Sequence, residues 1–211
     1  RFGGKLTSFD AAAALKVPGV VNVVQISRGV AVVARSFWAA TQGLAVLTAE
    51  WDNDKAENRS SAQMFADFDK LAAASGTIAK TQGNASQALD KAAKSISASY
   101  HFPYLAHAAM EPLNAVLHKS GEQLHVYGGL QMPDMVKSVC AEITGVAPEQ
   151  VKLHVMQSGG GFGRRAVPDC EIFAEAAEVA KAMQFVAPIK VQWSRENDMR
   201  GGRYRPMHVH Q

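Results

Sequence analysis

The sequence predicts an α+β fold in which a sheet is layered on helices. β-branched, apolar runs at 20–26 and 30–34 indicate strands. Runs of helical periodicity with capping residues, at 133–145 and 169–183, indicate helices. In the second half the expected elements follow the order strand, helix, strand, glycine loop, helix, strand, which is typical of helices packed on a sheet. Of the 211 residues 47% are apolar and 19% are charged, so we expect a packed core.

The first 52 residues are expected to hold short elements joined by turns. An alanine-rich helix comes first, and either Ser8 or Asp10 can cap it. The two strands named above follow it. Residues 36–51 then predict a second helix, with Ser36 as its N-cap.

The middle of the chain is polar and is expected to separate two domains. Residues 52–61 are typical of a linker or a long loop, and the spacing of apolar residues at 62–75 predicts a helix. The expected organisation is therefore a first domain at 1–52, a linker with a helix at 53–93 and a second domain at 94–211.

The second domain carries the clearest local signals. Its expected elements are a strand at 94–102, a hairpin turning at Ser120–Gly121, a helix at 133–145, a strand at 151–157, a helix at 169–183 and a strand at 189–194. Pro133 stands at the first position of its helix and Gly145 just after its end, which is the usual asymmetry of helix termini. Asp169 is the expected cap of the next helix.

Charge, cysteine content and hydropathy indicate neither a nucleic-acid partner, nor a zinc site, nor a membrane span. The net charge of +3 is too small to indicate a nucleic-acid partner. A basic cluster between Lys190 and Arg205 is either a solvated loop or a local anion site. Cys140 and Cys170 lack zinc-site spacing, and we interpret them as buried thiols, although a disulfide is also compatible with the sequence. No apolar run reaches the length of a membrane span.

The stretch QSGGGFGRR, residues 157–165, raises the main functional question. It lies between a predicted strand and a predicted helix, where backbone N–H groups can face an anion. It matches neither the P-loop nor the G-x-G-x-x-G pattern, so a nucleotide phosphate is not indicated. We expect a close approach of the backbone to a bulky ligand, with Phe162 packing on it and Arg164 or Arg165 supplying charge. The alternative is a flexible turn.

The segment SGGGFGRR (158–165) resembles the glycine loop of the molybdenum hydroxylases of the xanthine dehydrogenase/aldehyde oxidase family. Within that family it is most similar to the large (beta) subunit of the isoquinoline 1-oxidoreductase group. Four further stretches carry the same resemblance, at 17–52, 104–116, 128–155 and 193–206. They imply a partial a/b hammerhead domain, followed by the first part of an α/β two-layer molybdopterin-binding domain. They also imply that the chain is an internal fragment.

The resemblance implies a set of cofactor-binding residues. Gln131 corresponds to the family glutamine whose amide hydrogen-bonds an oxo ligand of molybdenum. The other expected contacts to molybdopterin are Gly160, Gly161, Phe162, Gly163 and Arg164. No catalytic residue is expected in this chain, because the general-base glutamate of the family lies beyond residue 211. We therefore expect the chain alone to be inactive.

The resemblance also implies an activity for the intact protein. It would hydroxylate N-heteroaromatic compounds or oxidise aldehydes with oxygen derived from water. Ala166 stands where purine-oxidising members have a glutamate, so the resemblance implies a less polar heteroaromatic compound or an aldehyde rather than a purine. The cofactor would be molybdopterin in its cytosine dinucleotide form, a small partner subunit would carry iron–sulfur clusters, and the location would be periplasmic or at the inner membrane. The alternative is a non-enzymatic module whose loop holds a small anion or a partner protein.

Two pairs of side chains, His107 with Glu111 and His208 with His210, are further candidates. His107 and Glu111 have the spacing of an acid–base pair, but we interpret them as a brace at the start of a strand. His208 and His210 are two residues apart, which places both imidazoles on one face of a strand, where they could bind a metal. We interpret them as a surface pair and expect no metal ligand in the chain.

Overall fold

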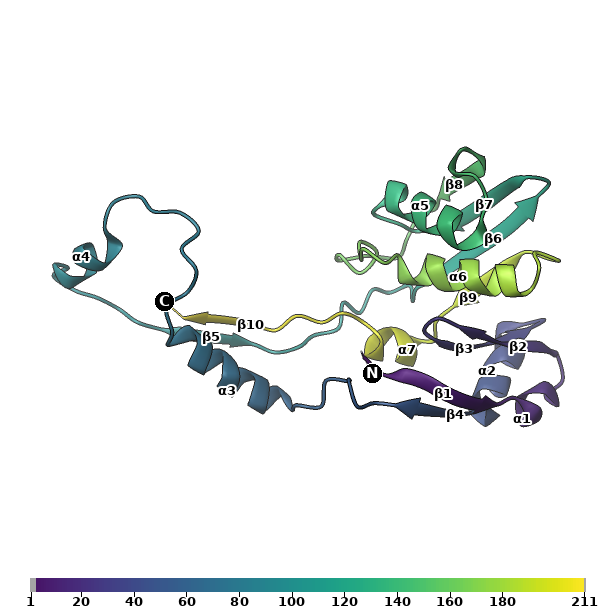
Figure 1. The fold of residues 1–211 in the computed structure, drawn as a ribbon, viewed down its shortest axis with the longest axis horizontal. Coiled ribbons are helices and arrows are strands. Elements are labelled where there is room, and N and C mark those ends of the chain that lie inside the picture. Colours follow the sequence, from purple (N-terminus) through teal and green to yellow (C-terminus); the bar gives the residue numbers. More distant parts are fainter. Residues whose placement is uncertain (1–2, 211) are drawn as a thin grey trace. The chain divides into compact units, whose positions relative to one another are not determined.

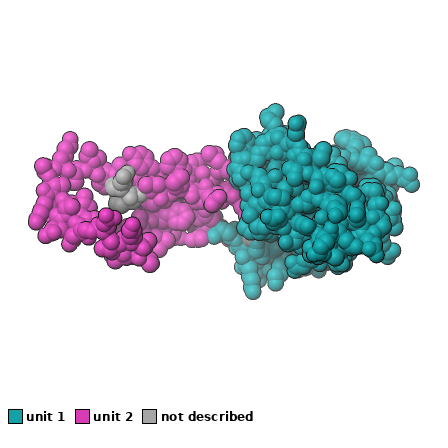
Figure 2. Space-filling view, turned by 90° about the horizontal axis from the view of Figure 1, so that it is seen from above, with its two compact units in different colours: residues 1–57, 107–202 teal, residues 58–106, 203–211 magenta. Residues whose placement is uncertain are grey.

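A computed structural model describes residues 3–210 of the chain (Figure 1). Helices and strands are mixed along the chain, which confirms the α+β class. The contacts divide the chain into two compact units, one made of residues 1–57 and 107–202 and the other of residues 58–106 and 203–211 (Figure 2). The domain boundaries that the sequence indicates, after residues 52 and 93, stay a prediction.

A four-stranded sheet forms the centre of the first unit. Its strand order is β8 (Val151–Val155), β7 (Gln123–Gly128), β6 (Asn114–Ser120), β9 (Ile189–Gln192). β6 and β7 form the expected antiparallel hairpin, and β9 is antiparallel to β6. β7 and β8 are parallel, and α5 (Pro133–Thr144) makes the crossover between them.

Two helices, α5 and α6 (Glu171–Ala182), pack on the sheet. Burial alternates along the hairpin, so Leu117, Leu124 and Val126 are buried in the core that these helices cover. Full burial of each such side chain stabilises the fold by about 1.5–3 kcal/mol. The core therefore holds β8 and α6 in place, and the loop that joins them is the glycine loop.

The ends of the two core helices differ from each other. α5 begins with Pro133 and ends before Gly145, whose φ of +78° is left-handed, so both predicted boundary residues are confirmed. The prediction that Asp169 caps α6 is wrong. Cys170 occupies the N-cap position, and among the described residues no side chain caps the helix. The Asp169 carboxylate pairs with Arg28.

The first 52 residues contain the predicted hairpin, β2 (Val20–Ile26) and β3 (Gly29–Ala34), and α2 (Phe37–Val46), which Ser36 caps. The short helix α1 (Ala12–Leu15) precedes them. β1 (Lys5–Asp10) and β4 (Thr48–Asp52) also pair as antiparallel strands. The sequence had predicted helix for parts of β1 and β4. That prediction was wrong because the two strands, at opposite ends of residues 5–52, pair with each other.

The smaller elements of this unit are the 3-10 helix η1 (Pro148–Gln150) and α7 (Arg195–Arg200), which Ser194 caps. Cys140 and Cys170 are free and buried, which confirms the interpretation as buried thiols. Burial, with a smaller contribution from Cys170, raises the pKa of Cys140 to about 12. A thiol with so high a pKa is unreactive near neutral pH.

The second unit is built around a two-stranded antiparallel sheet, β5 (Ser99–Phe102) with β10 (Met207–His210). The helix α3 (Ser61–Ala72) contacts β10, and a capping box between Ser60 and Gln63 defines its start. A short helix, α4 (Ala85–Asp90), completes the unit. Among residues 3–210, no helix has both the length and the apolar character that a membrane crossing requires.

Candidate functional site: the glycine loop

The segment 157–165 lies in the connection between β8 and α6, residues 156–170, which contains no helix or strand. This confirms the predicted strand–loop–helix arrangement. The loop is held at one end by the parallel β7–β8 pair and at the other by a largely buried helix. Rigid elements on both sides are what a preorganised binding loop needs.

Backbone conformation explains part of the glycine content. Gly160 and Gly163 have φ values of +101° and +90°, which residues other than glycine rarely adopt. Phe162 lies between them at φ +52°, where an L-residue is disfavoured by roughly 1–2 kcal/mol. Its side chain is 75% exposed, so packing within the described chain does not offset this strain. Strain of this kind is common at ligand-binding sites.

Close approach explains the other two glycines. A Cβ atom at Gly159 would lie 2.7 Å from Cβ of Glu111, and one at Gly161 would lie 2.9 Å from Oε1 of Gln131. Both distances are below those of ordinary carbon contacts. The run of three glycines therefore lets two distant segments of the chain reach the loop.

Gln131 is one of these neighbours, although it precedes the loop by about thirty residues. Its Oε1 accepts a hydrogen bond from N–H of Arg165 at 3.2 Å, and its own N–H donates to the Arg165 carbonyl at 3.4 Å. Its Nε2 donates to no residue in the described part of the chain. Gln131 and the glycine loop, which the sequence analysis assigned to one site, thus lie together.

Four consecutive backbone donors form the outer rim of the loop. The N–H groups of Gly160, Gly161, Phe162 and Gly163 donate to no other group among residues 3–210. The N–H groups on either side are satisfied, since Gly159 donates to Glu111 and Arg164 donates to Gly161. Successive unpaired N–H groups near left-handed residues form an anion-binding concavity. The arrangement can therefore bind a group with several acceptor oxygens.

Arg165 braces the loop from behind. Its guanidinium donates to the carbonyls of Gly160 at 2.9 Å, Gly129 at 3.1 Å and Glu111 at 3.3 Å. It also forms an ion pair with the Glu111 carboxylate at 2.9 Å, and its side chain is 1% exposed. All of these partners are within the protein, so this charge holds the loop's shape.

Glu111 completes the brace. Its carboxylate accepts hydrogen bonds from N–H of Gly159 and from Nδ2 of Asn114, both at 2.8 Å. Burial raises the pKa of Glu111, but these two hydrogen bonds and the charge of Arg165 outweigh it, so the pKa lies below its usual value. The bond to Asn114 confirms that Glu111 braces the start of a strand. Its contact with the glycine loop was not predicted.

Arg164 points into the protein. Its side chain is 3% exposed, pairs with the buried carboxylate of Glu171 and lies 5.2 Å from the ring of Trp193. Glu171 also lies 3.4 Å from Arg28 of the β2–β3 turn. Neither arginine of the loop therefore has a solvent-facing guanidinium, and a contact between Arg164 and a cofactor stays a prediction.

Sequence reasoning did not assign Glu111 or Gly129 to this site. Gly129 is needed because a Cβ atom there would lie 2.4 Å from Cβ of Ser158. Only its position two residues before Gln131 could have marked it in the sequence. No local pattern connects Glu111 with a loop 48 residues away.

A model of the molybdopterin cofactor-binding domain family matches residues 68–211, which is more than half of the chain. The matched range begins within α3, ahead of the boundary at residue 94 that the sequence indicates.

Known relatives are similar over most of the chain. The isoquinoline 1-oxidoreductase subunit beta of Brevundimonas diminuta is 31% identical, over 93% of this chain and 26% of that protein. The aldehyde oxidoreductase molybdenum-binding subunit PaoC of Escherichia coli O157:H7 is 28% identical, over 96% of this chain and 30% of that protein. The chain thus spans less than a third of the length of these relatives.

Among solved structures, the aldehyde oxidoreductase of Desulfovibrio gigas superposes with a TM-score of 0.67 at 15% identity. The superposition covers 98% of this chain and 28% of that one. At this identity the match shows a shared fold. The hammerhead and two-layer organisation that the resemblance implied stays a prediction.

Proposed function

We propose that the glycine loop and Gln131 form one wall of a molybdenum hydroxylase site, since this chain belongs to the molybdopterin cofactor-binding domain family. The observation that carries the proposal is the row of four unpaired N–H groups at 160–163, beside the Gln131 amide. The enzymatic activity belongs to the intact protein, because relatives are more than three times as long as this chain.

The residues present fit such a cofactor. The oxygens of an anionic cofactor would accept hydrogen bonds from the loop N–H groups. Nε2 of Gln131 can donate to an acceptor without changing the charge of the site. The exposed ring of Phe162 offers a flat apolar surface next to the donors. When bound, the cofactor would supply oxygen transfer and two-electron chemistry, and this chain would position it.

The finer features of the activity are also part of the proposal. The substrate would be an aldehyde or an N-heteroaromatic compound, in keeping with the names of the relatives and with Ala166. The cofactor would be the cytosine dinucleotide form, and a small partner subunit would carry the iron–sulfur clusters. The general-base glutamate would lie beyond residue 211. The family match does not favour the alternative of a non-enzymatic binding module.

The test is Gln131→Ala in the intact protein, with Gln123→Ala as a control on an exposed strand position. Groups that support a metal site typically contribute 10–100-fold to activity or metal affinity. We expect turnover of aldehydes and N-heterocycles to fall by about that factor while the fold stays intact. Molybdenum content and circular dichroism are measured in parallel. Full molybdenum content with unchanged turnover would refute the role of Gln131.

A second experiment tests whether this chain holds a complete site. The purified 211-residue chain is supplied with molybdenum cofactor and assayed with aldehydes, N-heterocycles and an artificial electron acceptor. We expect no turnover above a cofactor-only control, because a missing general base alone lowers rates by about 10²–10⁴. Turnover above that control would mean that the active site lies entirely within these residues.

A further inference from the structure

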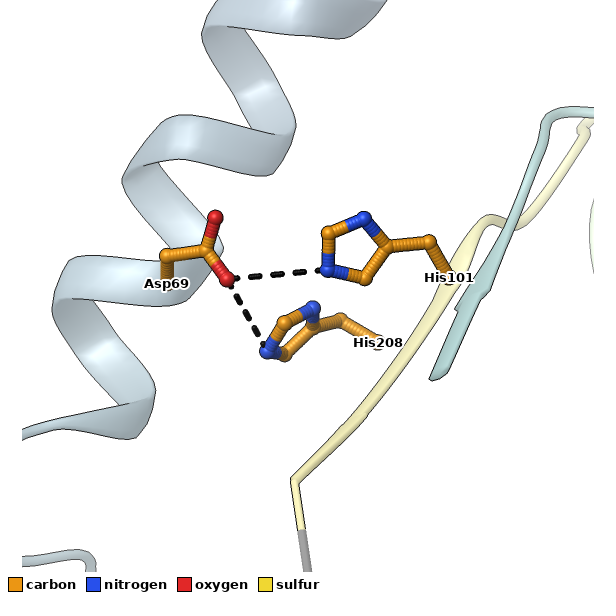
Figure 3. A group of neighbouring side chains, drawn as sticks. All are labelled: Asp69, His101 and His208. Carbon is orange, nitrogen blue, oxygen red and sulfur yellow. Dashed lines mark ion pairs between the residues drawn. The ribbon is translucent and has the colours of Figure 1, made fainter. Parts of the chain in front are cut away.

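Three side chains that are far apart in the sequence meet in the second unit. His101 on β5 and His208 on β10 are directly paired across the antiparallel ladder. Asp69 on α3 lies 3.6 Å from Nε2 of His101 and 3.5 Å from Nε2 of His208, measured to the same carboxylate oxygen (Figure 3). In the figure both imidazoles extend from the strands toward the carboxylate on the helix.

The spacing of these atoms suits a metal ion better than it suits hydrogen bonds. Hydrogen bonds to oxygen are usually about 2.7–3.2 Å long, so 3.5 and 3.6 Å are too long for good ones. Tetrahedral zinc with bonds of about 2.0–2.1 Å has ligand atoms roughly 3.3–3.4 Å apart. The three candidate ligand atoms all lie within 4.8 Å of one another. Shifts of a few tenths of an ångström would bring the two measured pairs to that geometry.

Neighbouring groups preorganise two of the three ligands. Phe65, one helical turn before Asp69, stacks on the His101 ring at 5.0 Å with an interplanar angle of 10°. The rings of His101 and His208 lie 4.7 Å apart. The His208 side chain is 8% exposed, whereas Asp69 is 57% exposed. The cluster thus combines one well-packed imidazole with a ligand that solvent can reach.

We propose that Asp69, His101 and His208 form a site for a divalent transition-metal ion such as Zn²⁺. Two imidazoles and one carboxylate are ligands typical of zinc and other first-row metals, whereas Mg²⁺ and Ca²⁺ prefer oxygen alone. A fourth position stays open for water. The ion would tie α3 to the β5–β10 sheet. The site shares no residue with the glycine loop, so it is independent of the proposed cofactor binding.

This proposal departs from the sequence-based expectation that the chain has no metal ligand. That expectation rested on the spacing of His208 and His210, whereas the site takes its ligands from three separate segments. The His210 side chain lies outside the described part of the structure.

The experiment titrates Zn²⁺ into the intact, chelator-treated protein and follows binding by calorimetry. Co²⁺ serves as a spectroscopic probe, and zinc is quantified separately from molybdenum by elemental analysis. We expect one equivalent to bind, with the absorption of four-coordinate Co²⁺. Asp69→Asn and His208→Ala should each weaken binding by at least about 10-fold. His125→Ala is the matched control, because Nδ1 of His125 lies 3.0 Å from Nε2 of His154 and forms the other close histidine pair.

Two outcomes would overturn the proposal. One is the absence of stoichiometric Zn²⁺ binding at micromolar concentrations. The other is binding that His125→Ala abolishes and Asp69→Asn leaves unchanged. Asp69 lies on an exposed helix surface, so the Asp69→Asn variant is expected to fold normally, and circular dichroism checks its fold. The Asn variant therefore decides the matter even if His208→Ala proves unstable.

Discussion

The rear and the rim of the glycine loop are built in opposite ways. At the rear, Arg165, Glu111 and the oxygen of Gln131 hydrogen-bond with one another or with the loop backbone. At the rim, the N–H groups of residues 160–163 have no partner in the described part of the chain, and Phe162 is exposed to solvent. The side-chain charges therefore fix the shape of the loop, and the backbone is what it presents to a ligand.

The difference follows from burial. A buried charge that lacks a partner is strongly destabilising, so both guanidiniums must be paired inside the protein. Exposed N–H groups incur little penalty, because water satisfies them until a ligand replaces it. The loop can consequently hold a row of donors without losing much stability. Mutations at the rear should affect folding, and mutations at the rim should affect binding.

The largest expected effect is at the rear, in Arg164→Leu. Within residues 3–210, the change leaves the Glu171 carboxylate, 2% exposed, with the 3.4 Å contact to Arg28 as its one remaining ion pair. Removing one partner of a buried ion pair typically destabilises a protein by about 3–5 kcal/mol. Urea unfolding measures this, with Arg200→Leu on the exposed end of α7 as the control. Equal unfolding midpoints for the two variants would contradict the buried pairing.

A smaller effect is expected from the pH dependence of Glu111. Because its pKa is lowered in the folded state, its contribution to stability is present above the unfolded value, about 4.3, and disappears as the pH falls through the folded value. Glu111→Gln should remove on the order of 1 kcal/mol at neutral pH, since solvent screens this carboxylate. Its unfolding free energy should approach that of the unmodified protein in acid.

The control for this comparison is Glu149→Gln, at an exposed position before β8. Chemical unfolding of all three proteins between neutral pH and about pH 3 spans the expected window. A difference between Glu111→Gln and the unmodified protein that stays constant across this range would show that the carboxylate does not brace the loop through its charge.

The smallest effect on stability is expected at the rim. Phe162→Gly relieves the left-handed strain, whereas Phe162→Ala retains it, so the glycine variant should be the more stable of the two by about 0.5 kcal/mol once the greater chain entropy of glycine is subtracted. Both variants remove the exposed ring, so both should lower molybdenum content in the intact protein. Thermal unfolding and elemental analysis give the two readouts. Normal molybdenum content in both variants would limit the rim's role to its N–H groups.

Elements with local signals were predictable from the sequence. The turn at Ser120–Gly121, the ends of α5 and the cap of α2 each depend on residues within a few positions of one another. The glycine loop was recognisable for the same reason, and its motif carried the family resemblance. Gln131 was assigned by that resemblance, and the structure shows only that it lies beside the loop.

Features that depend on distant segments could not be predicted. The β1–β4 pairing joins segments about forty residues apart, and both segments also have helix-compatible composition. The partners of Arg164 and Arg165 within the protein are set by tertiary packing, so the sequence could not indicate the pairs with Glu171 and Glu111. The Asp69 cluster draws on three elements, so no spacing in the sequence could indicate it.

The contact between Gln131 and Arg165 has a consequence for chemical selectivity. A primary amide is a dipole with two unlike ends, and here the oxygen end is tied to the main chain. The amino end donates to no described residue and is left for another group. A visiting atom that carries lone pairs finds a ready donor in this side chain, whereas a visiting N–H or O–H group must share an oxygen that already accepts a hydrogen bond. The fold thus gives the amide a fixed polarity, and glutamate at this position would keep the tether but reverse that preference.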